Sequence, residues 1–213
     1  MAKQFLRGFF WCSDEAILEY FRKNDPCQFA TKYLAEAVRH FDSTLKRIAA
    51  AVALFNLGID SKLRGCDLIA FKVRDVCHGN QVATRATVMQ HKTQRPVQFE
   101  ITAAARDALQ AWIKLAGLRS EAFLFPSRLH DSPHLGTRRY ARILQHWVDD
   151  LGLDRADYGT HSMRRTKATL IYRRTKNLRA VQLLLGHSKL ESTVRYLGIE
   201  VDDALEISEQ TEI

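Results

Sequence analysis

The chain has 213 residues, of which 46% are hydrophobic and 26% charged, as in a globular protein with one sizeable core and at most a small appendage. This composition excludes a disordered chain and a collagen-like fibre, and no apolar run reaches the roughly 20 residues of a membrane helix. Lysine and arginine total 32 against 24 acidic residues, a net charge of +8. The charge favours DNA or RNA as a partner, although a solvated basic surface without a partner has the same composition.

The cysteines and the N-terminal stretch indicate the compartment. Four scattered cysteines without a Cys-x-x-Cys pair are typical of reduced thiols and do not favour a metal cluster. The hydrophobic stretch over residues 5–11 is too short, and contains too many polar residues, for a signal peptide. We therefore expect a cytoplasmic protein with no membrane association.

Residues 1–42 are predicted to form a short helical segment, and residues 43–213 the main domain. Apolar side chains recur at helical spacing over residues 28–41. Asp42 and Ser43 are typical of a helix end followed by a new N-cap. The next helix is then expected over residues 44–57, with Gly58 as its left-handed C-cap.

A small antiparallel sheet of three strands is predicted next. The first strand is expected over the apolar residues 69–76. Alternating apolar residues predict a second strand over residues 82–89 and a third over residues 96–101. The polar residues 90–95 between them predict a hairpin turn.

Beyond residue 102 the pattern is helical throughout. Helices are expected to begin at Thr102, Thr137, Thr160 or Ser162, Leu178 and Glu191. A further helix, acidic and amphipathic, is expected at the C-terminus from about residue 200 to residue 210. Leu170 and Ile171 are expected to be buried, and Gly186 is expected to end the helix that begins at Leu178. The predicted fold class is mainly α with a small three-stranded antiparallel sheet (α+β).

Two polar motifs lie in this helical part. His161 and Arg164 are three residues apart, so on a helix they share a face and can grip one anion. His187 follows Leu184-Leu185-Gly186, and Tyr196 lies nine residues further on. A helix that ends at the glycine and a short second helix can bring the imidazole and the phenol to the same pocket. A solvated surface helix and a half-buried structural tyrosine are the simpler alternatives.

Two further cations lie in the first half of the chain. Arg64 belongs to Leu63-Arg64-Gly65-Cys66-Asp67-Leu68, where Asp67 can buttress the guanidinium. Lys92 lies in the predicted hairpin turn, where a flexible side chain can reach a ligand. Each is equally compatible with an ordinary ion pair or an ordinary turn residue.

Taken together, six of these residues resemble the active-site pattern of the tyrosine recombinase (phage integrase-type) family: Arg64, Lys92, His161, Arg164, His187 and Tyr196. The family has an arginine in a Leu-Arg-x-x-Glu/Asp-Leu box, a hairpin lysine, a His-x-x-Arg box, a Leu-Gly-His box and a tyrosine nine residues later. All appear here in order across residues 43–213. Asp67 matches the acidic position of the first box, as a supporting residue.

The resemblance implies a catalytic domain that cleaves DNA through a covalent 3′-phosphotyrosyl link to Tyr196. Arg64 and Arg164 are then expected to hold the non-bridging phosphate oxygens, with a further hydrogen bond from His187. Lys92 is expected to protonate the departing 5′ oxygen.

His161 is expected to accept a proton or to orient its neighbours. Two arginines and a lysine on the phosphate require no metal, and no cofactor is expected. The expected partners are double-stranded DNA, further copies of the chain (dimer to tetramer) and an accessory protein. The acidic helix over about residues 200–210 packs either on a neighbouring subunit or on its own domain.

The chain also departs from the family pattern. Only about 42 residues precede the predicted catalytic domain, too few for the usual N-terminal DNA-binding domain. The sequence therefore predicts a compact recombinase, a protein that needs a partner, or a truncated product. The alternatives in function are a type IB topoisomerase and a non-catalytic DNA-binding regulator, and the complete set of catalytic residue types argues against the regulator.

Overall fold

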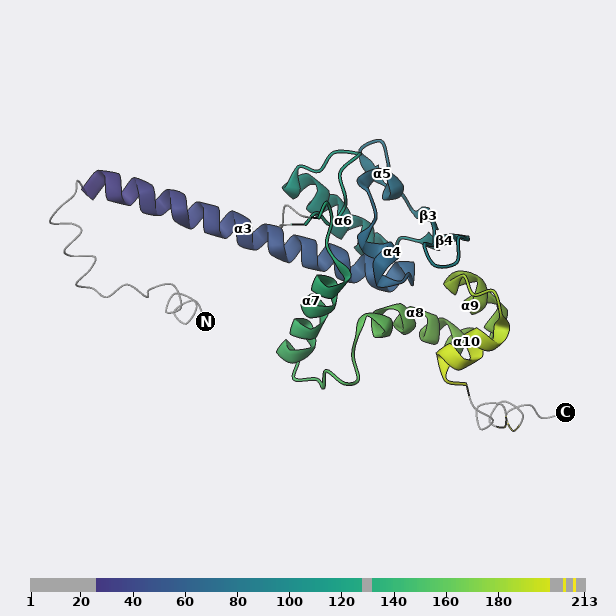
Figure 1. Cartoon of the computed structure of the whole chain (residues 1–213). Coiled ribbons are helices and arrows are strands. Elements are labelled where there is room, and N and C mark those ends of the chain that lie inside the picture. The colour runs from purple at the N-terminus through teal and green to yellow at the C-terminus, as the bar shows by residue number, and fades with distance from the viewer. Residues whose placement is uncertain (1–25, 128–131, 200–204, 206–208, 210–213) are drawn as a thin grey trace. The chain divides into compact units, whose positions relative to one another are not determined.

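The computed structural model describes residues 26–127, 132–199, 205 and 209, with side chains from Asp42 onward. In chain order the elements are α3 (Pro26–Ser61), α4 (Gly65–Ile69), α5 (Val73–Val76), β1 (Cys77–His78), β2 (Gln81–Val82), β3 (Arg85–Met89), β4 (Pro96–Glu100), α6 (Ala103–Ala116), α7 (Thr137–Asp150), α8 (Thr160–Thr175), α9 (Leu178–Leu185) and α10 (Leu190–Leu197) (Figure 1). The predicted fold class, mainly helical with small antiparallel sheets, is confirmed.

The chain divides into two compact units, Met1–Arg47 and Ile48–Ile213, and the candidate site lies within the second. In the described part of the chain, no helix combines the length and the apolar character needed to span a membrane. The predicted acidic C-terminal helix lies outside the described residues except for Leu205 and Glu209, which are both exposed.

Helix α3 continues through the break predicted at Asp42 and Ser43. The Asp42 carboxylate lies 2.7 Å from Lys46 Nζ one turn later, and such a pair supports a continuous helix. Gly58 also lies inside the helix. A Cβ there would come within 3.3 Å of Met163 Cε and 3.4 Å of the Tyr140 hydroxyl, so this glycine permits close packing and does not act as a C-cap.

The strand predicted over residues 69–76 is wrong. Helices α4 and α5 occupy most of this segment, because a short apolar run fits a buried helix as well as a buried strand. The three-stranded sheet is therefore replaced by two two-stranded sheets, β1–β2 and β3–β4. In the second sheet Arg85 pairs with Glu100 and Met89 with Pro96, and the predicted hairpin turn over residues 90–95 is confirmed.

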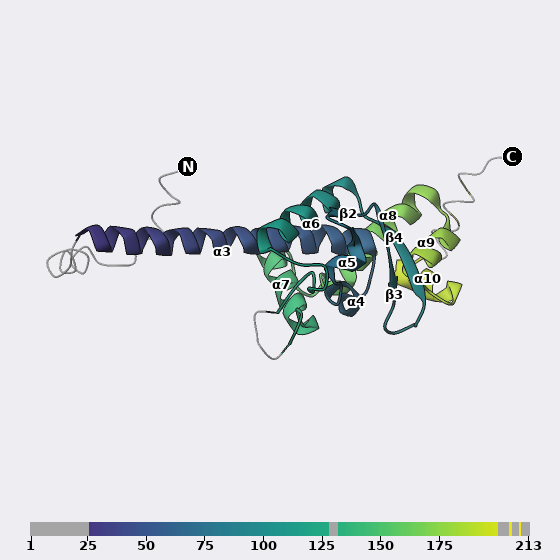
Figure 2. The same cartoon turned by 90° about the horizontal axis from the view of Figure 1, so that it is seen from above.

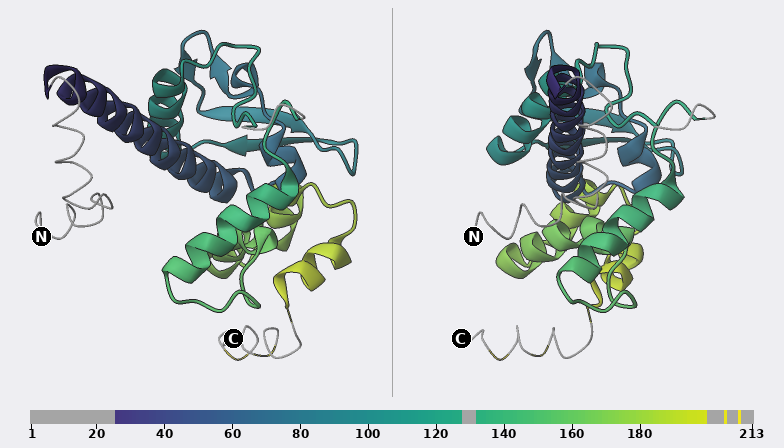
Figure 3. Two further views of the ribbon diagram at one scale, coloured as in Figure 1. Left: turned by 60° about the vertical axis from the view of Figure 1, so that its left-hand side comes forward. Right: turned by 90° about the vertical axis from the view of Figure 1, so that its left-hand side faces the viewer.

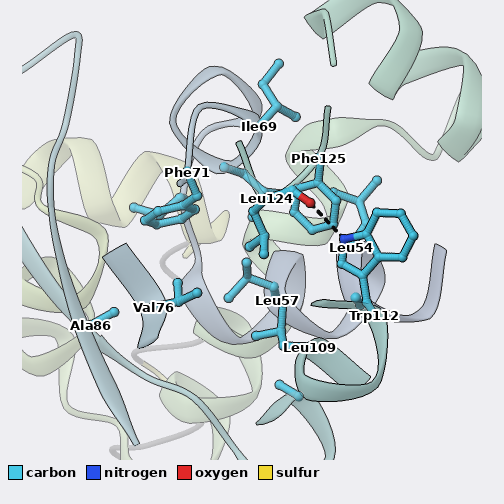
Figure 4. Close-up of a cluster of buried hydrophobic side chains, with 14 of the residues drawn as sticks. Leu54, Leu57, Ile69, Phe71, Val76, Ala86, Leu109, Trp112, Leu124 and Phe125 are labelled. Carbon is cyan, nitrogen blue, oxygen red and sulfur yellow. Dashed lines mark hydrogen bonds between the residues drawn. The ribbon is translucent and has the colours of Figure 1, made fainter. Parts of the chain in front are cut away.

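The main hydrophobic core joins the C-terminal part of α3 to α4, α5, α6 and the β3–β4 hairpin. Large side chains such as Leu57, Phe71 and Leu109 are almost wholly buried in it (Figure 4). The Trp112 indole donates a 2.7 Å hydrogen bond to the Leu124 carbonyl, so its polar edge is satisfied inside the core. This core is the rigid support for α4 and the hairpin.

A second, smaller hydrophobic cluster holds α8, α9 and α10 together. Its buried members are Ala168, Val181, Leu185 and Leu197. Helices of eight residues are unstable alone, so α9 and α10 depend on this packing. Helix α9 also contacts β4, and the hairpin lies beside α9 in the views of Figure 2 and Figure 3.

Most of the predicted helix ends in this half are confirmed. The Thr102 hydroxyl caps α6, and Gly186 ends α9 with a positive φ of 66°. The prediction for Leu170 is wrong, because its side chain is 59% exposed. Helix α8 packs instead through Met163, Arg164 and Ala168, and Ile171 is only half-buried.

Four charged side chains form a buried ionic cluster that ties α8 to β4 and to the end of α3. Lys62, which is fully buried, donates to both Glu100 carboxylate oxygens at 3.0 and 3.1 Å. Lys167 Nζ lies 2.7 Å from Asp60 Oδ1 and 2.6 Å from Glu100 Oε1. Burial alone would raise the pKa of Glu100, but the two ammonium groups outweigh it and lower that pKa. The cluster is internally neutral.

Candidate active site

Arg64 lies between α3 and α4 and is the N-cap residue of α4. Its Nη1 donates to Gln90 Oε1 at 2.8 Å. The predicted buttress from Asp67 is not the contact observed, because Asp67 Oδ1 accepts a 2.9 Å hydrogen bond from the His91 backbone N–H. Asp67 therefore supports the hairpin turn, and the guanidinium of Arg64 has a neutral partner.

Lys92 lies in the turn between β3 and β4, and its side chain is exposed. The turn around it is held firmly. Gln90 N donates to the Arg95 carbonyl at 3.0 Å, and the Thr93 hydroxyl donates to Gln90 Oε1 at 2.9 Å. A fixed turn with a free lysine at its tip allows the ammonium to reach a bound ligand.

His161 and Arg164 lie in the first two turns of α8, but their surroundings differ. His161 is exposed, whereas Arg164 is only 2% exposed. Arg164 Nη2 donates to the Leu185 carbonyl at 2.8 Å, and within the described residues its Nε has no hydrogen-bond partner. Burial, together with the positive charge of Arg64, lowers the pKa of Arg164, whereas Tyr196 and the buried carboxylate of Asp67 oppose this shift.

His187 follows the glycine that ends α9, and its ring Nδ1 lies 3.1 Å from the buried Thr193 hydroxyl. Burial and the guanidinium groups of Arg164 and Arg64 lower the pKa of His187 to about 4, so the imidazole is neutral at pH 7. If the hydroxyl donates to Nδ1, the ring proton is on Nε2. The imidazole can then donate a hydrogen bond to an anion in the site.

Tyr196 lies on α10 beside both of these groups. Its ring stands nearly perpendicular to the His187 ring, with centroids 5.4 Å apart, and Arg164 Cζ lies 5.6 Å from its centroid. The hydroxyl makes a long 3.5 Å contact to the His161 carbonyl. Burial raises the pKa of the phenol, and the nearby guanidinium groups of Arg164, Arg165 and Arg64 oppose that rise. The phenol is protonated at neutral pH.

The structure brings the side chains of four of the six predicted site residues into one contact network: Arg64, Arg164, His187 and Tyr196. His161 joins this network through its backbone carbonyl, 3.5 Å from the Tyr196 hydroxyl, and its side chain is exposed. Lys92 is joined to this network through its turn and not by its own side chain. The network connects the main core to the smaller cluster of α8, α9 and α10.

Two positively charged groups lie close together in this site. Both guanidinium groups donate to neutral oxygens, of Gln90 and of the Leu185 backbone. Within the described ranges, neither forms a salt bridge with a carboxylate. No group of three or more His, Cys, Asp or Glu side chains is arranged to bind a metal ion in the part of the chain that is described. The site is therefore suited to an anion with several oxygens.

Two contributing residues were given no role by sequence reasoning. Gln90 reads as a polar turn residue, and nothing in its neighbourhood signals that it is buried. Thr193 carries a weak signal, because it lies four residues before the buried Leu197 and so shares the inner face of α10.

The family model of the phage integrase family matches residues 31–201. The chain belongs to the phage integrase family. This confirms the resemblance drawn from the six side chains. A probable integrase/recombinase of Bacillus subtilis (strain 168), YoeC, is 30% identical over 149 residues, covering 70% of this chain and 77% of that protein.

The tyrosine recombinase XerC of Erythrobacter litoralis is 27% identical over 165 residues, covering 78% of this integrase-family chain and 51% of XerC. Among solved structures, the XerH site-specific recombinase in its pre-cleavage complex with difH substrate has a TM-score of 0.61 at 20% identity, covering 76% of this chain and 47% of XerH. XerA recombinase also has a TM-score of 0.61, at 18% identity, covering 81% of this chain and 60% of XerA. The structures support the fold alone, and the chain spans about half the length of these Xer proteins.

Proposed function

We propose that this integrase-family chain is a site-specific DNA recombinase that cuts and rejoins DNA through a covalent 3′-phosphotyrosyl intermediate at Tyr196. The observation that carries the proposal is the pair of guanidinium groups, Arg64 and Arg164, that form no salt bridge with a carboxylate among the described residues and lie beside the phenol. A scissile phosphate is the anion that such an arrangement would serve, with residues 43–213 as the catalytic domain.

Arg64 and Arg164 would hold the two non-bridging oxygens of this phosphate. Guanidinium groups suit phosphate because their N–H donors are fixed in a planar fork. Negative charge on these oxygens grows as the phosphorus becomes five-coordinate, so prealigned donors stabilise the transition state more than the ground state. The neutral His187 would add a third donor through Nε2.

Tyr196 would attack the phosphorus with its phenolic oxygen. The new bond between this oxygen and phosphorus forms as the bond to the 5′ oxygen breaks. The phenolic proton must leave, and His161 is the titratable group whose backbone the hydroxyl already contacts, so we assign it as the acceptor or as an orienting group. Lys92 would give its proton to the departing 5′ oxygen.

The products would be a 3′-phosphotyrosyl link and a free 5′-hydroxyl. The link keeps a reactive phosphodiester, so a 5′-hydroxyl from another strand can reverse the step and reseal the DNA in a new pairing. Side-chain cations supply the charge stabilisation, so the proposed step uses neither a metal nor a cofactor. Strand exchange requires several copies of the chain on DNA. An accessory protein would be needed where the chain alone does not select a site. We place the protein in the cytoplasm.

The test is covalent trapping on DNA. The protein is incubated with a pool of nicked duplexes that carry a randomised 30-base-pair core, and complexes that survive SDS are recovered and sequenced. We expect an adduct with the parent protein and none with Tyr196→Phe, whereas Tyr158→Phe, an exposed tyrosine, should behave as the parent. DNA binding without any adduct would support a regulator, and plasmid relaxation by single copies would support a topoisomerase.

The role of Lys92 has its own chemical test. A duplex with sulfur in place of the bridging 5′ oxygen has a leaving group that needs no proton, because a thiol is far more acidic than an alcohol. Lys92→Ala should lose cleavage of the ordinary duplex and regain it on the sulfur duplex. Equal loss on both duplexes would assign Lys92 to binding.

A further inference from the structure

The side chain of Gln90 connects the parts of the site that come from different regions of the chain. It lies directly after β3, two residues before Lys92, and is fully buried. We propose that Gln90 is a positioning residue that holds Arg64 and Arg164 in one geometry and fixes the turn of Lys92 against them. This inference rests on the proposed cleavage of DNA.

The oxygen end of the amide binds Arg64. Gln90 Oε1 accepts from Arg64 Nη1 at 2.8 Å and from the Thr93 hydroxyl at 2.9 Å. The first contact fixes the guanidinium of a residue 26 positions earlier, and the second fixes the turn that carries Lys92. One oxygen atom therefore links the phosphate-holding arginine to the hairpin.

The nitrogen end of the amide reaches the end of α9. Gln90 Nε2 donates to the Leu185 carbonyl at 3.2 Å, and the same carbonyl accepts from Arg164 Nη2 at 2.8 Å. This carbonyl is free to accept because it belongs to the last turn of a helix. The amide and the buried arginine thus share one acceptor, at the residue before Gly186.

Close packing leaves little freedom for this arrangement. A Cβ on Gly186 would lie 2.5 Å from Val97 Cγ2 and 3.1 Å from Gln90 Nε2, and its φ is positive. The backbone of Gln90 is also engaged, since its N–H donates to Arg95 and its carbonyl accepts from Gln94 N at 2.8 Å. The amide therefore has a single supported orientation.

An amide suits this place better than a carboxylate. It accepts from a guanidinium at one end and donates to a carbonyl at the other, whereas a carboxylate only accepts. A glutamate would also neutralise Arg64 and repel the phosphate. A neutral partner orients Arg64 while leaving its positive charge available to the DNA.

The experiment compares three variants in single-turnover cleavage at saturating DNA, on a duplex recovered by the trapping described above. Gln90→Met keeps the length and removes all three side-chain hydrogen bonds, and Gln90→Glu keeps the bond to Arg64 and adds a charge. Gln98→Met is the control, because Gln98 is exposed on β4. We expect cleavage to fall roughly 10- to 100-fold in both Gln90 variants, with Gln90→Glu the slower, and to stay unchanged in the control.

Two readouts separate positioning from a loss of structure. The dissociation constant for DNA should change less than about threefold in Gln90→Met, because most phosphate contacts lie elsewhere. In an Arg64→Lys background, Gln90→Met should add little further loss, because its effect acts through Arg64. The same fold-loss in both backgrounds, or unchanged cleavage in both Gln90 variants, would overturn the inference. Absence of any adduct from the parent protein would instead overturn the proposed function.

Discussion

Positively charged side chains in the interior of this protein have two different kinds of partner. In the ionic cluster, Lys62 and Lys167 each bind carboxylates of the same cluster. In the candidate active site, Arg64 and Arg164 bind only neutral oxygens. Asp67 is the buried carboxylate whose negative charge acts on Arg164, so the two guanidinium groups share one acidic neighbour and bind it through no salt bridge in the described structure. Burying charge with incomplete compensation is costly, so the second arrangement is unfavourable for folding alone. The difference indicates that a ligand supplies further negative charge.

The two places are also neighbours in sequence on α8, since Arg164 and Lys167 are three residues apart. The ionic cluster fixes α8 through Lys167, and this positions Arg164 one turn earlier. The cluster therefore supports the candidate site structurally, whereas the role proposed for the site is to bind an anion. The following experiments test that division, in order of expected effect.

Arg164→Lys should have the largest effect on catalysis. It keeps a positive charge but loses the planar fork and the contact to Leu185. We expect the single-turnover cleavage rate to fall by about 100-fold or more, equivalent to about 3 kcal/mol of transition-state stabilisation. Arg174→Lys, on an exposed arginine in the last turn of α8, is the matched control and should stay close to the parent rate. A similar loss in both variants would contradict a specific role for Arg164.

Glu100→Gln should have the largest effect on stability. The change leaves the fully buried Lys62 with only neutral hydrogen-bond partners. Because the Glu100 side chain is itself 39% exposed, the cost should lie below that of breaking a fully buried pair, at about 2 kcal/mol of unfolding free energy. Urea denaturation measures it. Glu121→Gln removes an exposed partner of Arg74 and should cost less than about 1 kcal/mol. Equal costs would show that the buried cluster is no stronger than a surface pair.

The titration of His187 should make the folding stability of the protein depend on pH. Its pKa in the folded protein is lowered to about 4, below the unfolded value of about 6.5. Folding therefore favours the neutral ring, and this contribution is present above pH 6.5 and is lost as the pH falls from 6.5 to 4. His187→Gln should flatten the loss of stability over that range.

The same titration reports on the anion site. NMR of the His187 ring, assigned with His187→Gln, should give a pKa far below 6.5 in the free protein. Bound phosphate or DNA should raise it, because the anion offsets the two arginines. A free-protein pKa at or above 6.5 would mean that the guanidinium groups lie elsewhere.

Of these variants, Arg164→Met should change the free energy of unfolding least. An apolar side chain of similar length removes a desolvated charge that forms no salt bridge in the described structure, so the unfolding free energy should stay within about 1 kcal/mol of the parent or rise. Cleavage should fall at least as far in this variant as in Arg164→Lys. A loss of unfolding free energy as large as that of Glu100→Gln would show that Arg164, like Lys62, mainly stabilises the fold.

The local motifs could be predicted because short-range geometry controls them. His161 and Arg164 follow each other within one turn of a helix, and Gly186 ends α9 through its own positive φ. The hairpin turn that carries Lys92 is likewise determined by nearby residues. In these places the amino-acid spacing alone was sufficient.

Two of the failures have a cause in long-range packing. The strand expected over residues 69–76 and the burial expected for Leu170 each depended on neighbours far away in the chain, whereas the helix end expected at Asp42 fails for a local reason, the ion pair with Lys46 one turn later. Leu170 points away from the packed side of α8 because Ala168 and Arg164 occupy that side. An apolar residue does not by itself determine which face of a helix is covered.

The amino-acid sequence by itself determined the family, and it predicted the six chemical groups of the candidate site and their order along the chain. Only the tertiary structure decided which partner each group has: Gln90 for Arg64, the Leu185 carbonyl for Arg164 and Thr193 for His187. The physical reason is that spacing within a helix or a hairpin follows from local backbone geometry. Contacts across 26 or 95 residues form only when separate elements pack together.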